Sequence, residues 1–458
     1  MTEQSVTQNL LFSDLIKKPV IAQFDQEHSS SDGGAILLKA ADRQLGLIER
    51  LAGCMSDSRQ SGKLKHQLPE LFSQRIFSIA CGYSDGNDAA RLVDDPIHKL
   101  LVGRDPLEGD PLASQSTLSR FENSPSPRDL YRLGSALADT VLDYQRRRLR
   151  KVGRVTLDLD VTHDATHGQQ QLSFFNGYYD THCYLPLLAF LRFNDEPEQY
   201  LTAAVLRAGN APDKLGAVAL LKRLLPRIWV TFPRARVLVR LDGGFTCPEI
   251  LAWLDNAPRV DYVCGLANNA VLKRKAKKLM NQARRLSKQS GQTAHVYEEC
   301  LYQAQTWSQP RRVIIKAEVV CQPGREPKDN CRFVVTNLAT SPRYIYETVY
   351  CYRGELENRV KELKDGLQLD RTSCSSFWAN QFRVLMTAAA YALLQHIRCK
   401  AARTRCARAQ VSTLRERLLK LGVHVVASVR RIVLHLPASY PWMKDWKRLA
   451  QALGASPG

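Results

Sequence analysis

Four polar residues stand at defined intervals in the segment YCYRGELENRVKELKDG, residues 350–366: Tyr350, Arg353, Glu357 and Lys364. The apolar residues between them have helical spacing, which predicts an amphipathic helix. At about 100° per residue, the four polar side chains share one face of a regular α-helix, beside a leucine stripe that can pack on a sheet. Charge pairs on a solvated helix would explain the same residues without any activity. The segment therefore needs partners elsewhere in the chain before it indicates a site.

Carboxylates at the ends of two predicted strands are the candidate partners. In VTLDLDVT, Asp158 and Asp160 share one face of a strand because side chains alternate with period two. In VRLDGGF, Asp242 directly follows an apolar strand. Ligands of open α/β sheets bind outside the carboxyl ends of strands, where Asp160 and Asp242 fit. Asp158 has the same facing as Asp160, so the choice of first ligand between these two stays open.

Three carboxylates from Asp160, Asp242 and Glu357 suit one chemistry in particular. Two divalent cations about 3.5–4 Å apart need hard oxygen ligands, and such a pair catalyses phosphodiester displacement. The arginine and lysine of the predicted helix could hold nearby phosphates, and its tyrosine offers a hydroxyl or a stacking ring. The sequence thus predicts a metal-dependent nuclease-type site.

The charge of the chain points to the same kind of substrate. Its 65 Lys and Arg against 45 Asp and Glu give a net charge of +20, which favours a polyanionic partner. Residues 269–292 contain eight basic residues and no acidic one, and the segment from Arg398 to the end has thirteen basic residues against two acidic ones. We expect both segments to hold nucleic acid without sequence preference.

The order of predicted elements indicates an α/β fold with a mixed sheet. Residues before about 150 have helical periodicity, and LASQSTLSRFENS among them resembles a DNA-reading helix, although such helix starts are common. Three strands follow, then alternating helices and strands. Expected regions are a helical DNA-binding region at 1–150, a catalytic domain at 151–268 and 343–400, a basic segment with a β-rich insertion at 269–342, and a basic region at 401–458.

The hydropathy and the cysteines of the sequence indicate where in the cell we expect the protein. No run of about 18 apolar residues and no secretory leader is present, so we expect neither a membrane span nor secretion. The twelve cysteines are scattered without a CxxC pair, which is typical of reduced thiols in a cytoplasmic protein.

These motifs resemble a known family. The spacing of Tyr350, Arg353, Glu357 and Lys364 is similar to the Tyr-Arg-Glu-Lys signature of DDE transposases of the insertion sequence four group of bacterial mobile elements. LDLDVTHDATHGQQ, NGYYDTHCYLPLLAF, VRLDGGFTCPEILAWL and VRRIVLHLPASYPW look more narrowly like the insertion sequence thirteen-eighty family. The resemblance covers nearly the whole chain.

The resemblance implies an RNase H-like catalytic domain, with strands and helices in the order βββαβαβ and then a helix, interrupted by the β-rich insertion. It implies that Asp160, Asp242 and Glu357 are the catalytic metal ligands for two Mg²⁺ ions, which Mn²⁺ can replace. Arg353 and Lys364 would grip phosphate near the cleaved bond, and Tyr350 would position the terminal nucleotides.

The implied activity is cut-and-paste DNA transposition. The enzyme would act as an endonuclease on terminal inverted repeats and transfer the freed 3′-hydroxyl to target DNA. Double-stranded DNA is the expected partner, with a homodimer in the DNA complex and a nucleoid-associated location in a bacterial cytoplasm. The alternatives are an RNase H-like metal-dependent nuclease without strand transfer, and a DNA-binding regulator without catalysis.

Overall fold

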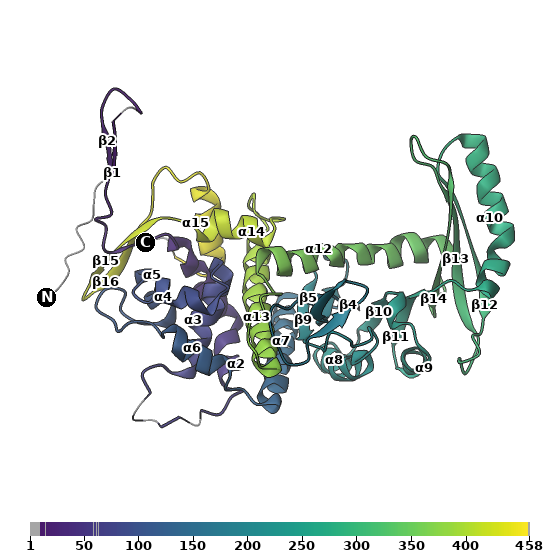
Figure 1. Cartoon of the computed structure of the whole chain (residues 1–458), viewed down its shortest axis with the longest axis horizontal. Coiled ribbons are helices and arrows are strands. Elements are labelled where there is room, and N and C mark those ends of the chain that lie inside the picture. Colours follow the sequence, from purple (N-terminus) through teal and green to yellow (C-terminus); the bar gives the residue numbers. More distant parts are fainter. Residues whose placement is uncertain (1–9, 14, 58, 61, 63, 457–458) are drawn as a thin grey trace.

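The structure is a computed structural model that describes residues 10–456 except 14, 58, 61 and 63. The molecule is elongated, with helices from both ends of the chain at one side, a sheet in the middle and a projecting arm at the other side (Figure 1). A β-hairpin of β1 (Leu10–Phe12) and β2 (Val20–Ala22) extends from the helical side. The helices before the sheet are α1 (Ile36–Leu45), α2 (Leu47–Ala52), α3 (Leu68–Cys81), α4 (Ala89–Leu92), α5 (Pro96–Val102), α6 (Gln115–Glu122) and α7 (Pro127–Arg148).

The expected helices before residue 150 are present, and local signals set their ends. Gly46 has a φ of 66°, a conformation that favours glycine, and it separates α1 from α2. Ser126 and Asp129 form a capping box at the start of α7, where Pro127 takes the first helical position. These helices pack around α13 (Phe377–Lys400), which is buried along most of its length.

The last part of the chain returns to these first helices. It contains α14 (Val411–Leu414), β15 (Val423–Ser428), β16 (Arg431–His435) and α15 (Met443–Ala452). Strand β3 (Ser29–Ser30) pairs with β15, so residues from both ends of the chain share a small sheet.

The central sheet has eight strands in the order β12-β13-β14-β11-β10-β4-β8-β9. Parallel pairing joins β4, β10 and β11, and the other pairs are antiparallel, so the predicted mixed sheet is confirmed. The strands are β4 (Arg154–Val161), β8 (Leu187–Phe193), β9 (Tyr200–Val205), β10 (Arg236–Leu241), β11 (Val260–Leu266), β12 (Ala294–Tyr302), β13 (Arg311–Val320) and β14 (Lys328–Thr336).

Apolar layers cover both faces of this sheet. Leu157 and Leu159 of β4 pack with α8 (Ala217–Thr231) and α9 (Pro248–Asn256) on one face. Phe190 of β8 packs with α13 on the other. Because side chains alternate along β4, Asp158 and Asp160 point to the face opposite that of the two leucines. A separate three-stranded sheet, β5 (Asp164–Ala165), β6 (Phe174–Asn176) and β7 (Thr181–Tyr184), lies between β4 and β8 in the chain.

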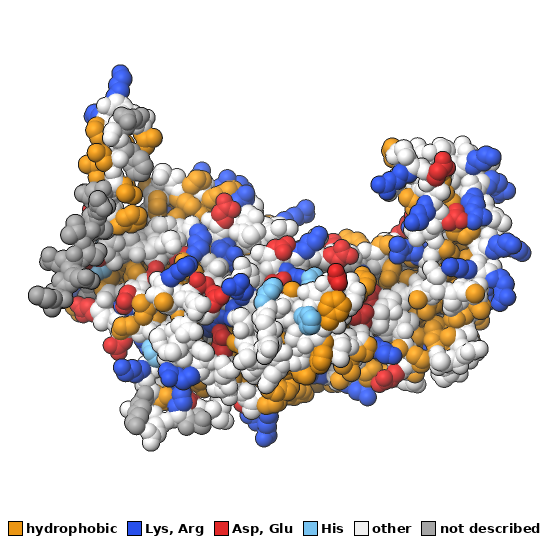
Figure 2. All heavy atoms as spheres, viewed as in Figure 1, with side chains coloured by type: hydrophobic (Ala, Val, Ile, Leu, Met, Phe, Trp, Pro, Cys, Tyr) orange, Lys and Arg blue, Asp and Glu red, His pale blue; other side chains and the backbone are white. Residues whose placement is uncertain are grey.

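The strands expected in a β-rich insertion extend the central sheet. Strand β14 pairs antiparallel with β11, with Val263 opposite Thr336, and β13 and β12 follow outward. Helix α10 (Ala270–Ser290) packs on β12 and β13 and completes the arm (Figure 1). All eight of its lysines and arginines are exposed, and Figure 2 shows many blue side chains on this arm.

The segment with the Tyr-Arg-Glu-Lys spacing is helical, but it is not the regular α-helix that was predicted. It contains π-turns at Ile345–Tyr350 and Glu362–Gly366, a 3₁₀ turn at Cys351–Gly354, and α12 (Glu355–Lys361) between them. Turns of different pitch change the angle between successive residues. The four polar residues therefore do not share one face in the way that a uniform α-helix would place them. The leucine stripe was correct, since Leu356, Leu363 and Leu367 are buried.

In the described part of the chain, no helix combines the length and apolar character needed to cross a bilayer.

Candidate active site at the strand ends

Two neighbouring parallel strands place Asp160 and Asp242 at one edge of the sheet. Asp158 of β4 pairs in register with Arg240 of β10. Asp160 and Asp242 each follow two residues later, so both lie at the carboxyl ends of these strands. Asp242 caps the short 3₁₀ turn that starts at Gly243, and its Oδ1 accepts a 2.9 Å hydrogen bond from the Gly244 backbone N–H.

Arg353 joins these two aspartates. Its Nη2 donates to Asp160 Oδ1 at 2.7 Å, forms an ion pair with Asp242 Oδ2 at 3.4 Å, and also donates to the Leu159 carbonyl at 3.2 Å. Side chains predicted from three separate parts of the sequence therefore meet at one guanidinium nitrogen. The Arg353 Nε is buried and has no hydrogen-bond partner among the described residues.

The electrostatic balance at Asp160 favours a further cation. Burial raises the pKa of the Asp160 carboxyl to about 6, with Arg353 lowering it and the neighbouring Asp242 raising it. One arginine thus only partly compensates two closely placed carboxylates. Carboxylate oxygens are hard ligands of the kind that Mg²⁺ and Mn²⁺ bind, so the residues present fit a divalent metal.

Asp158, the open alternative to Asp160, has a different partner. Its two oxygens accept from Arg240 Nε and Nη2, each at 2.7 Å, and Oδ2 also accepts from Gln199 Nε2 at 2.9 Å. Asp158 is 0% exposed and Arg240 is 2% exposed. A carboxylate so fully engaged has no free oxygen for an incoming ion, which favours Asp160 as the first ligand.

Tyr350 packs against the end of the neighbouring strand. A methyl group added at Gly265 of β11 would lie 2.5 Å from Tyr350 Oη and 2.8 Å from the Gly243 backbone nitrogen. Only a glycine at this position leaves room for the tyrosine hydroxyl beside the residues that follow Asp242. Burial raises the pKa of Tyr350, so the phenol stays protonated at neutral pH.

Lys364 and Glu357 lie outside the contact between Arg353 and the two aspartates. Lys364 Nζ donates to the His163 carbonyl at 3.0 Å and lies 3.5 Å from Asp370 Oδ2. Glu357 is exposed on α12, four residues after Arg353, and no described contact joins it to either aspartate.

One further acidic residue, Asp213, approaches the same edge of the sheet and was not predicted from the sequence. A methyl group at Gly244 would lie 2.2 Å from Asp213 Oδ2, so Asp213 covers the turn that follows Asp242. Burial and the neighbouring Asp242 raise the pKa of Asp213. Strand β9 runs parallel to β4 because each is antiparallel to β8, so the loop after β9 reaches the same edge. That strand direction is the signal that could have identified Asp213.

Another group of possible metal ligands lies elsewhere, at Asp32, Cys81 and His98. Within the described residues, it is the only set of three or more such side chains whose ligand atoms all lie within 4.8 Å of one another. Lys420 Nζ lies 2.7 Å from Asp32 Oδ1 and His98 Nε2 lies 3.0 Å from Oδ2. Burial also raises the pKa of the Cys81 thiol. The Lys420 ammonium already supplies positive charge to Asp32, so the group forms a buried polar link between the first and last parts of the chain.

Comparison with known proteins identifies the family. The family model described as Transposase DDE domain group 1 matches residues 12–457. No curated protein matches the chain. Among solved structures, the chain is similar to one in the cryo-EM structure of a piggyBac transposase synaptic complex with hairpin DNA, with a TM-score of 0.40, 11% identity, and coverage of 98% of this chain and 89% of that chain. The match to the family model spans nearly the whole sequence, and the chain therefore belongs to the DDE transposases of group 1, enzymes that cleave DNA.

Proposed function

We propose that this transposase moves an insertion sequence by cutting its ends and joining them to new DNA, with Asp160, Asp242 and Glu357 as its catalytic acids. The meeting of Asp160, Asp242 and Arg353 at the carboxyl edge of β4 and β10 carries the proposal. The strand order β9-β8-β4-β10-β11 supports an RNase H-like core. Within the DDE transposases, the sequence resembles the insertion sequence four group and, more narrowly, the thirteen-eighty family, and we propose that placement for it.

The same three acids would hold the divalent metal ions. Bound Mg²⁺, or Mn²⁺ in its place, would supply activation of the attacking oxygen and stabilisation of the leaving one. Asp160 and Asp242 have fixed positions on strand ends, whereas Glu357 stands exposed on α12, so its side chain would complete the set when the metal binds.

The remaining residues of the signature would bind and orient DNA. Arg353 would transfer its contact from the aspartates to a phosphate oxygen near the scissile bond, and Lys364 would hold a phosphate nearby. Tyr350, which packs on Gly265, would position the terminal nucleotides through its ring or hydroxyl.

The rest of the chain suits the handling of DNA ends. The helical region at 1–150 would read the inverted repeats, and the regions at 269–342 and 401–458 would hold duplex DNA through their exposed cations. Figure 2 shows that the face between the β1–β2 hairpin and the arm is hollowed, with α12 crossing it in Figure 1. Because two ends must be cut and joined together, we propose a homodimer in the DNA complex.

The test compares Glu357→Gln with Glu355→Gln, a matched change two residues earlier in the same helix. DNA carrying both ends of the element is incubated with each full-length protein and Mg²⁺. Glu357→Gln should abolish strand cleavage and keep binding of the ends, whereas Glu355→Gln should cut like the wild type. Unchanged cleavage by Glu357→Gln would refute the assignment of the third acid.

A second assay uses pre-cut ends with a 3′-hydroxyl and a supercoiled target plasmid. Joined products identify a transposase that transfers strands. Cleavage without joining would instead indicate the nuclease alternative, and the absence of both in Mg²⁺ and Mn²⁺ would indicate a DNA-binding regulator.

A further inference from the structure

Helix α6 presents an uncommon surface among the helices that precede the sheet. Five polar residues of one stripe are exposed: Gln115, Ser116, Ser119, Arg120 and, directly after the helix, Asn123. None of them is acidic. Its other face is buried, through Leu118, Phe121 and Glu122. By contrast, α3 is buried over most of its length.

Two adjacent residues of α3 fix α6 at both ends. The Gln74 side chain donates to the Ala113 carbonyl at 2.8 Å and accepts from the Ala113 N–H at 3.0 Å, just before α6 begins. Arg75 Nε donates to Glu122 Oε1 at 2.6 Å in the last turn of α6. Arg75 is 1% exposed, so this ion pair is shielded from solvent. The orientation of α6 relative to the core is therefore rigid.

Aromatic packing adds to this support. Phe121 of α6 makes edge-to-face contacts with Phe72 of α3 at 5.0 Å and with Phe382 of α13 at 5.1 Å, measured between ring centroids. Phe72 and Phe382 also contact each other, with 5.8 Å between their ring centroids. A short helix held in this way keeps its outer face in a fixed place.

The chemistry of this face differs from that of the other exposed helices. Helix α10 exposes lysines and arginines, and α15 exposes Lys444, Lys447 and Arg448, which suits phosphates. Helix α6 exposes amides, hydroxyls and one guanidinium. Arg pairs with guanine and Asn or Gln with adenine through two hydrogen bonds each, which is how side chains read base edges in the major groove.

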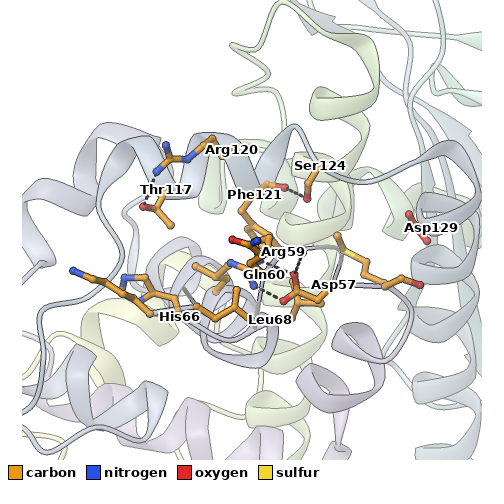
Figure 3. Close-up of a pocket in the computed structure, with 15 residues that line it drawn as sticks. Asp57, Arg59, Gln60, His66, Leu68, Thr117, Arg120, Phe121, Ser124 and Asp129 are labelled. Carbon is orange, nitrogen blue, oxygen red and sulfur yellow. Dashed lines mark hydrogen bonds and ion pairs between the residues drawn. The ribbon is translucent and has the colours of Figure 1, made fainter. Parts of the chain in front are cut away.

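The space beside α6 is open. A cavity of about 680 Å³ lies between α6 and the segment that precedes α3. Figure 3 shows Thr117 and Arg120 on its α6 side and His66 across from them. Lys65 lines the same cavity and is exposed, so a cation stands next to the polar stripe. Asp57 and Asp129 also line the cavity, but Asp57 pairs with Arg59 and Asp129 caps the start of α7. The stripe itself carries a cation and no acid, which matches a polyanion.

We infer that α6 is the helix that reads base pairs, with Gln115, Arg120 and Asn123 contacting base edges of duplex DNA. This inference rests on the proposed function in that it names the element that recognises the ends of the insertion sequence. It does not depend on the catalytic acids.

The test uses full-length protein with Glu357→Gln, so that bound DNA stays intact, and a library of duplexes with a randomised core as the probe. Sequences retained by the parent protein define its preferred site. Affinity for that site and for a scrambled duplex is then measured by fluorescence anisotropy at fixed salt. The variants are Arg120→Ala, Arg120→Lys and Asn123→Ala, and Lys288→Ala on α10 serves as the matched loss of charge.

Arg120→Ala should lower affinity for the preferred site roughly 10-fold or more and change affinity for the scrambled duplex by less than about 3-fold. Arg120→Lys keeps the charge and should still relax selection at one base pair. Lys288→Ala should weaken both duplexes equally. Equal losses on both duplexes with Arg120→Ala, or an unchanged preferred sequence with all three α6 variants, would overturn the inference.

The outcome is separable from that of the proposed function. A protein that selects a sequence through α6 but never cuts supports this inference while the catalytic proposal fails. A protein that cuts its ends and loses no selectivity with the α6 variants gives the opposite result. Thermal unfolding of each variant identifies any that lose affinity because the fold is lost.

Discussion

Arg240 and Asp158 form a two-pronged ion pair between strands β10 and β4, with both hydrogen bonds at 2.7 Å. The third guanidinium nitrogen of Arg240 donates to the Val349 carbonyl at 3.0 Å, one residue before Tyr350. One buried arginine thus connects the two strands that carry Asp160 and Asp242 to the segment that carries Arg353. We infer that this contact sets where the helical segment with Tyr350 and Arg353 lies over the strand ends.

Replacement of this pair separates its role in positioning from its role in stability. Apolar residues of similar volume often replace a buried ion pair without loss of stability, whereas removal of one partner costs about 3–5 kcal/mol. The double variant Asp158→Leu with Arg240→Met should therefore melt near the wild type, while Asp158→Leu alone should melt well below it. Because the contact to Val349 is lost, cleavage by the double variant should fall about 10-fold or more.

Differential scanning calorimetry and a Mg²⁺-dependent cleavage assay on the same preparations measure both effects. Binding of duplex DNA serves as the control and should be kept. A stable double variant with full cleavage would show that the pair does not position the helix.

Arg353 should compete with metal ions for the two aspartates. Its Nη2 contacts Asp160 and Asp242 in this structure, so the guanidinium takes up negative charge that a cation would otherwise use. Without DNA, Arg353→Gln should bind Mn²⁺ several-fold more tightly than the wild type, as measured by electron paramagnetic resonance of free Mn²⁺. Cleavage should nevertheless fall, because the variant lacks the cation that we propose for the phosphate near the scissile bond.

One control variant defines that result. Asp242→Asn should weaken Mn²⁺ binding, which shows that the ions counted are at this site. Weaker binding by Arg353→Gln would mean that the arginine supports the metal site instead of competing for it.

Gly265 should be needed for the placement of Tyr350. In Gly265→Ala, the new methyl would lie 2.5 Å from Tyr350 Oη, and overpacking of this kind costs about 1–3 kcal/mol. We expect a lower thermal midpoint and slower cleavage. Gly243→Ala is the steric control, since its methyl would come no closer than 3.9 Å to Gly265 and should leave the midpoint nearly unchanged.

Removal of the tyrosine hydroxyl tests the cause. Tyr350→Phe in the Gly265→Ala background should recover part of the thermal midpoint, because one of the two close contacts is then relieved. No recovery would locate the strain at the Gly243 backbone alone.

Local patterns predicted which aspartates lie at the strand ends. Period-two alternation and the position after an apolar strand were enough to select Asp160 and Asp242, since both signals depend only on neighbouring residues. Neighbouring residues in the sequence could not distinguish Asp158 from Asp160 as the first metal ligand. It depends on the register of β4 against β10, which places Arg240 opposite Asp158.

Long-range pairing also explains what the sequence did not reveal. The pairing of β14 with β11 joins residues about 70 positions apart, so the arm strands could not be recognised as part of the central sheet. The π-turn at Ile345–Tyr350 includes Val349, whose carbonyl accepts from Arg240 of a distant strand, and such a contact is not visible in the local sequence. A uniform α-helix therefore predicted the buried leucines correctly, but it did not predict the relative orientation of the four polar residues.

Asp164 should make the stability of the protein depend on pH. Burial raises the pKa of its carboxyl to about 7, and the negative charge of Asp370 acts in the same direction. A hydrogen bond from Thr372 and the positive charges of Lys364 and Arg383 act against this shift. The Asp164 Oδ1 atom is buried without a hydrogen-bond partner. In the unfolded chain the carboxyl ionises near 3.8, so between about pH 4 and 7 the native state holds a proton that the unfolded state has released. Stability from this group therefore falls as the pH rises through this window.

Asp164→Asn removes that dependence because the amide stays neutral. Its thermal midpoint relative to the wild type should rise from pH 5 to pH 8, with a free-energy difference of up to about 4 kcal/mol at the upper end. Thermal unfolding followed by circular dichroism at pH 5, 6, 7 and 8 measures the trend. Asp365→Asn, which changes an exposed carboxyl, is the control and should keep a constant difference from the wild type. A difference between Asp164→Asn and the wild type that does not change with pH would show that Asp164 is ionised in the folded protein across this range, held by Lys364 and Arg383.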